Sequence, residues 1–204
     1  MFPRETALKQ LEVMKKDVKD MRLAAEKWPT KFQTLISICL SARTRDETTI
    51  WVCEKLFKKF PTPEEMSKAS VKEIEEIIRS VNFYQNKSKN IIACAKKLVR
   101  EFNGKIPNSI ERMTELPGVG RKTANVFLSE YGSEAIGVDT HVTYISNYLG
   151  WVETENAEKI ERVLKELFPK EIWSEVNPTL VRFGKTHTSK TEKNKLLEEI
   201  KIIK

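Results

Sequence analysis

The sequence predicts an all-α protein. Apolar residues recur at helical spacing along nearly the whole chain, beginning with Phe32, Leu35, Ile36, Cys39 and Leu40. No segment of comparable length alternates apolar and polar residues, which is the pattern of a half-buried strand. With 204 residues, the chain can form one large or two small domains, each with its own core.

Proline, glycine and polar clusters divide this pattern into about ten helices. Further helical faces are predicted at Ile74, Ile77, Ile78 and Val81, at Ile91, Ile92, Ala95, Leu98 and Val99, and at Ile160, Val163, Leu164, Leu167 and Phe168. After Thr186 the tail is charged but has apolar residues at helical spacing. We expect it to dock as a final helix through Leu196, Leu197, Ile200 and Ile203.

Composition limits the partners and the compartment. The net charge of +7 suits a polyanion but also an ordinary basic protein. Three widely spaced cysteines, Cys39, Cys53 and Cys94, form no CxxC pair and are predicted to be small core residues in a reducing compartment. The first residues lack the apolar run of a signal peptide, and no stretch approaches a membrane span. We therefore expect a cytoplasmic protein.

The stretch LPGVGRKT, residues 116–123, predicts a helical hairpin over about 108–132. Asn108 or Ser109 can cap the helix that enters the turn, and Gly132 can end the helix that leaves it. Gly118 and Gly120 allow a tight turn and a close approach of the backbone to a ligand.

The second helix of the hairpin starts near Gly120, so its first amides and the positive end of its dipole form an anion site. Arg121 and Lys122 add positive charge there, which favours a nucleic-acid phosphate as the ligand. A nucleotide-binding P-loop is the rival interpretation, but an arginine interrupts its pattern and a helix rather than a strand precedes it. A purely structural turn is the other alternative.

The stretch GVDTHV lies further along the chain than Lys122 and contains Asp139. It can cap a helix that turns Val142, Ile145 and Leu149 inward. Taken alone, this aspartate could be only a cap, and Lys122 only a phosphate contact.

Together these motifs resemble the helix-hairpin-helix (HhH-GPD) DNA glycosylase superfamily, in particular its endonuclease III branch. The resemblance covers roughly residues 25–187, because LISICLSARTRD, NFYQNKSKNI and NGKIPNSIERMTELPGVG occur in the same order. It implies two helical domains with a DNA groove and a base pocket between them. One would comprise residues 25–134, and the other residues 1–24 and 135–204.

The resemblance also implies roles for Lys122 and Asp139 at that pocket. The lysine amine would attack C1' of the sugar and form a Schiff base, after which β-elimination cuts the strand. The amine must be neutral to attack, and burial, the helix terminus and Arg121 would favour that form. Asp139 would assist deprotonation and stabilise the positive charge that develops on the sugar.

Base removal requires flipping of the damaged nucleotide, and side chains must fill the gap. The resemblance assigns this filling to the loops around residues 41–43 and 82–84. Close relatives often have glutamine in place of Arg43, so the preferred opposite base is open. The predicted DNA-binding residues are Ser41, Arg43, Phe83, Tyr84, Gly118, Val119, Gly120, Arg121 and Thr123.

Two cofactor expectations follow. In related hairpins a monovalent cation binds turn carbonyls, which here would be those of Thr114, Leu116 and Val119, so a K+ or Na+ ion is predicted there. Many relatives hold a [4Fe-4S] cluster with four C-terminal cysteines, but this chain has none after Cys94. Thr188 stands near the first ligand position and His187 cannot bind a cluster alone. We expect no cluster, with the final helix in its place.

The predicted function is a base excision repair DNA glycosylase with apurinic/apyrimidinic (AP) lyase activity. Its partner would be double-stranded DNA with damaged bases or abasic sites, and the protein would act as a monomer. Damaged, mainly oxidised, pyrimidines are the expected substrates; uracil or thymine mispaired with guanine and oxidised purines are alternatives. A non-catalytic helix-hairpin-helix DNA-binding module is the alternative of a different class.

Overall fold

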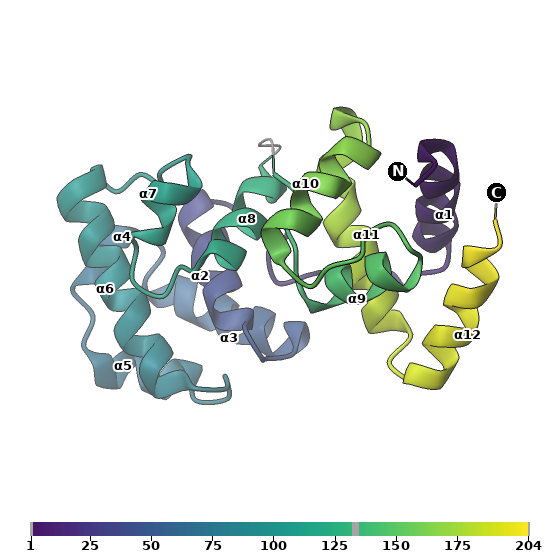
Figure 1. Ribbon diagram of the computed structural model, residues 1–204. Coiled ribbons are helices and arrows are strands. Elements are labelled where there is room, and N and C mark those ends of the chain that lie inside the picture. Colours follow the sequence, from purple (N-terminus) through teal and green to yellow (C-terminus); the bar gives the residue numbers. More distant parts are fainter. Residues whose placement is uncertain (1, 132–134, 204) are drawn as a thin grey trace. The chain divides into compact units, whose positions relative to one another are not determined.

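A computed structural model describes residues 2–131 and 135–203 and is helical, as the sequence predicts (Figure 1). Its described residues contain no β-strand. The elements are α1 (Arg4–Lys16), α2 (Lys31–Ser41), α3 (Asp46–Lys59), α4 (Pro63–Ser67), α5 (Val71–Ile78), α6 (Tyr84–Phe102), α7 (Ile110–Thr114), α8 (Arg121–Glu130), α9 (Thr140–Tyr148), α10 (Ala157–Leu167), η1 (Lys170–Ile172), α11 (Trp173–Thr186) and α12 (Lys190–Lys201).

The chain forms two compact units. One consists of Arg22–Phe127, and the other of Met1–Met21 together with Leu128–Lys204. The first is named the hairpin unit here because it contains α7, the glycine turn and the start of α8. The second, which contains Asp139, is named the terminal unit. Each is described by itself.

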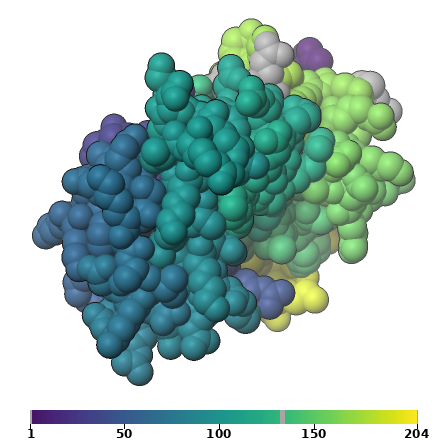
Figure 2. Space-filling view, turned by 90° about the vertical axis from the view of Figure 1, so that its left-hand side faces the viewer, coloured from purple at the N-terminus to yellow at the C-terminus, as the bar shows by residue number. Residues whose placement is uncertain are grey.

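Helix α6 is the support of the hairpin unit, since α2, α4 and α5 all pack against it. Side-chain caps start several of its neighbours: Thr30 caps α2, Thr62 caps α4, and Ser70 with Glu73 forms a complete capping box on α5. Figure 2 shows this unit, in blue and teal, on the face toward the viewer.

Most residues of the predicted apolar faces of the hairpin unit are buried; Ile77 is half-buried, and Val99 is exposed. The face that begins at Phe32 and the residues Ile74, Ile78, Ile91 and Ile92 are in the core. Val99 is an error of the prediction, because it is 36% exposed. The stripe of α6 ends at Leu98, so the next residue along already faces solvent.

The three cysteines lie in this core, as expected, and all three are free. Burial raises the pKa of the Cys39 and Cys53 thiols to about 12 and raises that of Cys94 as well. They are therefore protonated, apolar packing residues at neutral pH.

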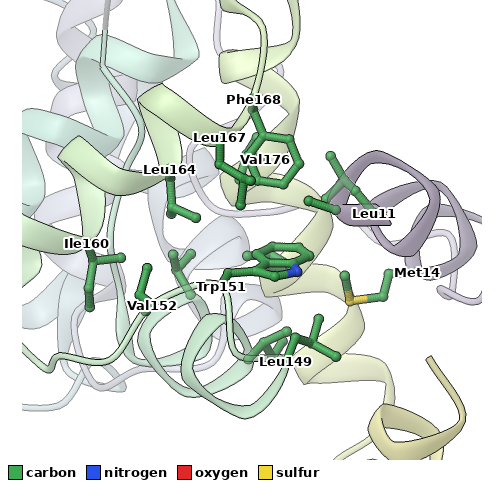
Figure 3. Packing of buried hydrophobic residues seen from close by; sticks show 14 of the residues in the cluster. Leu11, Met14, Leu149, Trp151, Val152, Ile160, Leu164, Leu167, Phe168 and Val176 are labelled. Carbon is green, nitrogen blue, oxygen red and sulfur yellow. The ribbon is translucent and has the colours of Figure 1, made fainter. Parts of the chain in front are cut away.

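The terminal unit joins both ends of the chain around one core. In Figure 3, Trp151 lies among Leu11 and Met14 of α1 and apolar residues of α10 and α11. Its indole Nε1 donates to Oε1 of the fully buried Gln10 at 2.6 Å, and Gln10 Nε2 donates to the carbonyl of Ile200 at 3.2 Å. One buried amide thus links α1, the segment after α9 and α12.

The tail docks as a helix, as predicted. α12 buries Leu197 and Ile200 in the core of the terminal unit, and Leu196 and Ile203 pack at its edge. The hydroxyl of Tyr148 donates to Glu198 at 2.8 Å, which fixes α12 against α9.

The predicted stop at Gly132 lies outside the described residues. Among the helices that are described, none is long and apolar enough to cross a membrane.

Candidate active site

The predicted hairpin is present in the hairpin unit. Ser109 caps α7 through its hydroxyl, which accepts from the amide of Arg112 at 3.4 Å. The chain then turns through two backbone bonds, Leu116 N–H to Met113 O and Val119 N–H to Leu116 O, each 3.0 Å long. The bond from Ala124 N–H to Gly120 O, also 3.0 Å, begins α8.

The two glycines of the turn are needed for different reasons. Gly118 has φ +80°, and a Cβ there would lie 2.9 Å from Cβ of Asn90 on α6. The carbonyl of Gly118 also accepts a contact from the thiol of Cys39 at 3.7 Å. Gly120 has no such constraint, because a Cβ added there would meet no atom within 4 Å. Gly118 therefore seats the turn against α6 and α2, whereas Gly120 leaves open space beside the start of α8.

The sequence interpretation missed Asn90 and Cys39 as supports of the turn. Asn90 lies within the NFYQNKSKNI stretch, but nothing in the sequence pairs it with a glycine 28 positions later. Cys39 was recognised only as a core residue.

Lys122 lies in the first turn of α8 and is exposed, as is Arg121, while Thr123 is half-buried. The amides of a first helical turn lack intrahelical acceptors and carry the positive end of the dipole. Positive charge and amide donors are therefore concentrated where a phosphate was expected. The expected burial of Lys122 is wrong for the free protein, since the protein does not cover this side chain.

Asp139 is the N-cap of α9, as predicted. Its Oδ1 accepts from the amides of His141 and Val142, both at 2.9 Å. The helix turns Val142, Ile145 and Leu149 into the core of the terminal unit. Asp139 is half-buried, and the cap bonds hold its Oδ1 in place.

The ring of His141 packs against α11. A Cβ added to Gly184 would lie 2.2 Å from its Nδ1, so only glycine leaves room for the imidazole. This contact sets the distance between α9 and α11 immediately beside Asp139.

Lys122 and Asp139 belong to different units, and each is placed within its own. Their pairing rests on the sequence and stays a prediction.

The two loops predicted to enter DNA lie together in the hairpin unit. Arg43 and Phe83 both have left-handed backbones, with φ of +57° and +59°, and both side chains are exposed. The guanidinium carbon of Arg43 lies 5.9 Å from the centroid of the Phe83 ring. Asn82 joins the loops: its side chain donates to the carbonyl of Arg43, and its amide donates to Thr44 Oγ1 at 3.2 Å.

The neighbouring candidates are less prominent. The hydroxyl of Ser41 donates to the carbonyl of Ile38 at 2.9 Å in the last turn of α2. Tyr84 is half-buried as the first residue of α6. Arg43 and Phe83 are thus the two exposed tips.

The predicted cation ligands lie around the same turn. The carbonyl of Leu116 already accepts from Val119 N–H, and a carbonyl oxygen has a second lone pair for an ion. The cation site on the carbonyls of Thr114, Leu116 and Val119 stays a prediction.

The residues present do not fit a four-cysteine cluster. No cysteine follows Cys94, and within residues 2–131 and 135–203 no group of three or more His, Cys, Asp or Glu side chains is arranged to hold a metal. His187 instead packs against the ring of Phe183 at 4.7 Å between centroids and contacts the carboxylate of Asp17 at 3.2 Å.

Comparison with known proteins agrees with this arrangement. Residues 36–170 match the family described as HhH-GPD superfamily base excision DNA repair protein. The chain is 43% identical to endonuclease III of Thermotoga maritima over 155 residues, covering 76% of this chain and 73% of that protein. Endonuclease III of Bacillus subtilis is 35% identical over 185 residues, which cover 88% and 84% of the two chains.

A solved structure of a trapped endonuclease III–DNA covalent intermediate is similar to this chain with a TM-score of 0.83 and 34% identity. The similarity covers 93% of this chain and 89% of the other. The match therefore extends well beyond the hairpin. The chain belongs to the HhH-GPD superfamily of base excision DNA repair proteins, and within it to the endonuclease III branch.

Proposed function

We propose that Lys122 is the nucleophile, and Asp139 its anionic partner, in the reaction of this repair enzyme. The protein is a base excision repair DNA glycosylase with AP lyase activity, and it acts on damaged pyrimidines in DNA. The observation that carries the proposal is an exposed lysine in the first turn of α8, directly after a turn seated by Gly118.

The reaction starts when the neutral amine of Lys122 attacks C1' and the base departs with the bonding electrons. The attack leaves Nζ bonded to C1' as a secondary ammonium, which gives one proton to Asp139. The nitrogen lone pair then forms the C1'=Nζ bond while the C1'–O4' bond breaks and O4' takes up a proton, so that the sugar ring opens and a protonated Schiff base remains. The C2' proton is then acidic, and its removal expels the 3' phosphate. A lysine is required for this route, because an activated water releases the base without a covalent linkage to the protein.

Because Lys122 is exposed in the free protein, bound DNA must complete its environment. The duplex would cover the amine of Lys122 and exclude water from it. Asp139 takes the proton and stabilises the developing sugar cation. Its cap bonds use Oδ1, so Oδ2 is the oxygen assigned to chemistry.

The turn is proposed to hold one phosphate of the strand that is cut. The first amides of α8 would donate to it, with the predicted DNA contacts at Val119, Gly120, Arg121 and Thr123. A K+ or Na+ ion on the carbonyls of Thr114, Leu116 and Val119 would bridge to the same phosphate. Such an ion would aid DNA binding without joining the chemistry. The proposed location is the cytoplasm, where the enzyme would act on the genome.

The preferred lesion is proposed to be an oxidised pyrimidine. A panel of duplexes containing thymine glycol, uracil opposite guanine, thymine opposite guanine or 8-oxoguanine tests this proposal by single-turnover base release. Thymine glycol should react fastest. The base opposite each lesion should also be varied, because Arg43 is proposed to contact that base once the damaged nucleotide has flipped out. Faster release of a mispaired or purine base would contradict the assignment.

Lys122→Gln should abolish covalent trapping by borohydride on an abasic-site duplex. DNA affinity should stay within a few-fold, because one charge among many phosphate contacts is lost. Arg121→Gln is the matched control: it removes the same charge from the same turn and should still trap. If Lys122→Gln lost binding together with trapping, Lys122 would be an anchor rather than the nucleophile.

Asp139→Asn should slow base release by orders of magnitude while leaving thermal unfolding unchanged. An asparagine Oδ1 can accept the same two amide bonds, so the cap persists while the charge is removed. Wild-type rates in this variant would exclude the carboxylate from the reaction.

Gly118→Ala and Gly120→Ala should separate folding from DNA binding. Gly118→Ala should lower the free energy of unfolding by roughly 1–3 kcal/mol, since alanine is strained at positive φ and meets Asn90. Gly120→Ala should leave it within about 0.5 kcal/mol, the range of surface substitutions. Both should weaken binding to damaged and undamaged duplexes alike, by about 1–3 kcal/mol for lost charged hydrogen bonds.

Urea unfolding and fluorescence anisotropy measure the two effects. The contrary outcome is a Gly120→Ala variant that binds undamaged DNA normally but discriminates poorly between different damaged bases. That result would show that the turn shapes the base pocket instead of holding a phosphate.

A further inference from the structure

Lys87 on α6 has a contact that the reaction does not explain. Its Nζ donates to the carbonyls of Leu40 and Ala42, both at 2.7 Å. The side chain is half-buried, and burial lowers the pKa of its amine to about 8. No described carboxylate forms an ion pair with it. The amine of Lys87 is thus partly removed from water, and its hydrogen bonds go to two backbone oxygens.

Those oxygens belong to the end of α2 and the start of the Arg43 loop. The last carbonyls of a helix have no intrahelical donor, and a cation is favoured at this negative end of the dipole. Ala42 has already left the helix, with φ −54° and ψ 117°, and Arg43 then adopts its left-handed backbone. A non-glycine residue keeps such a conformation only when its surroundings hold it there.

Lys87 and Asn82 hold the loop from both sides of that position. Lys87 binds the carbonyl before Arg43, and the Asn82 side chain binds the carbonyl of Arg43 itself. The loop is therefore fixed by bonds to the start of α6, next to Phe83. The exposed side chain of Arg43 takes no part in these backbone bonds. Its guanidinium lies over the Phe83 ring.

The same face of α6 reaches the glycine turn. Lys87 and Asn90 are three positions apart on α6, which places them on one side of the helix. Lys87 holds the Arg43 loop, and Asn90 supports Gly118. Phe83, the other exposed tip, is the N-cap of the same helix. Three segments assigned to DNA contact thus rest on the N-terminal part of α6.

We propose that Lys87 is a positioning residue for base flipping: by binding the carbonyls of Leu40 and Ala42, it fixes the Arg43 loop beside Phe83 so that both side chains enter the duplex as one unit. The inference rests on the proposed function in that Arg43 and Phe83 fill the gap in the DNA. It assigns Lys87 no contact with the reacting sugar.

Lys87→Met tests the proposal, because methionine keeps most of the packing volume and removes the donors. Two reactions are compared: base release from a thymine glycol duplex, which requires flipping, and borohydride trapping on single-stranded DNA with an abasic site, which does not. Base release should slow by about 10- to 100-fold, as expected for misplaced groups, while trapping stays within about two-fold. The fluorescence rise of 2-aminopurine placed beside the lesion should shrink in parallel.

Lys89→Met is the matched control, since Lys89 is exposed on the same helix and the substitution removes the same charge. It should leave both reactions unchanged. Lys87→Arg, which can still donate to two carbonyls, should recover much of the rate. If Lys87→Met fails to fold, Asn82→Ala decides, because it releases the same loop from its other side and should show the same split.

Base release at the wild-type rate in a folded Lys87→Met variant would overturn the proposal. An equal loss of base release and trapping would also overturn it, since Lys87 would then serve the chemistry or the fold as a whole. A wild-type protein that traps no abasic DNA would instead contradict the proposed function, whatever Lys87 does.

Discussion

The structure of the site depends on how the glycine turn is seated. At Gly118 the backbone passes so close to Asn90 that no side chain fits, and its carbonyl faces the thiol of Cys39. This contact fixes where α8 begins, and Lys122 is in the first turn of α8. Lys122, the proposed nucleophile, therefore takes its position from packing between α6, α2 and the turn.

Helix α6 extends this role to the loops of the hairpin unit that are proposed to contact DNA. Its first residues hold the loops of Arg43 and Phe83, and its next turn supports Gly118. One helix thus supports both loops and the glycine turn. A site that is built from loops keeps its geometry when a rigid element holds those loops. Lys122, by contrast, is an exposed side chain in the first turn of α8.

The sequence predicted the fold class, the hairpin, the Asp139 cap and the docking of the tail, because each depends on local patterns: helical periodicity, cap residues and glycine turns. It did not predict that Gly118 and Gly120 differ, since that depends on Asn90 from a distant helix. The exposure of Lys122 and the bonds of Lys87 were missed for the same reason. Val99 was assigned to the core because periodicity does not show where an apolar stripe ends.

Mapping the covalent bond tests the central claim most directly. Wild-type protein trapped on abasic DNA with borohydride would be digested and the modified peptide sequenced by mass spectrometry. Lys87 is the informative competitor, because burial lowers the pKa of its amine to about 8. We predict that the sugar remnant is on Lys122 alone. Attachment at Lys87, or at any other amine, would contradict the account of the glycine turn as the element that places the nucleophile.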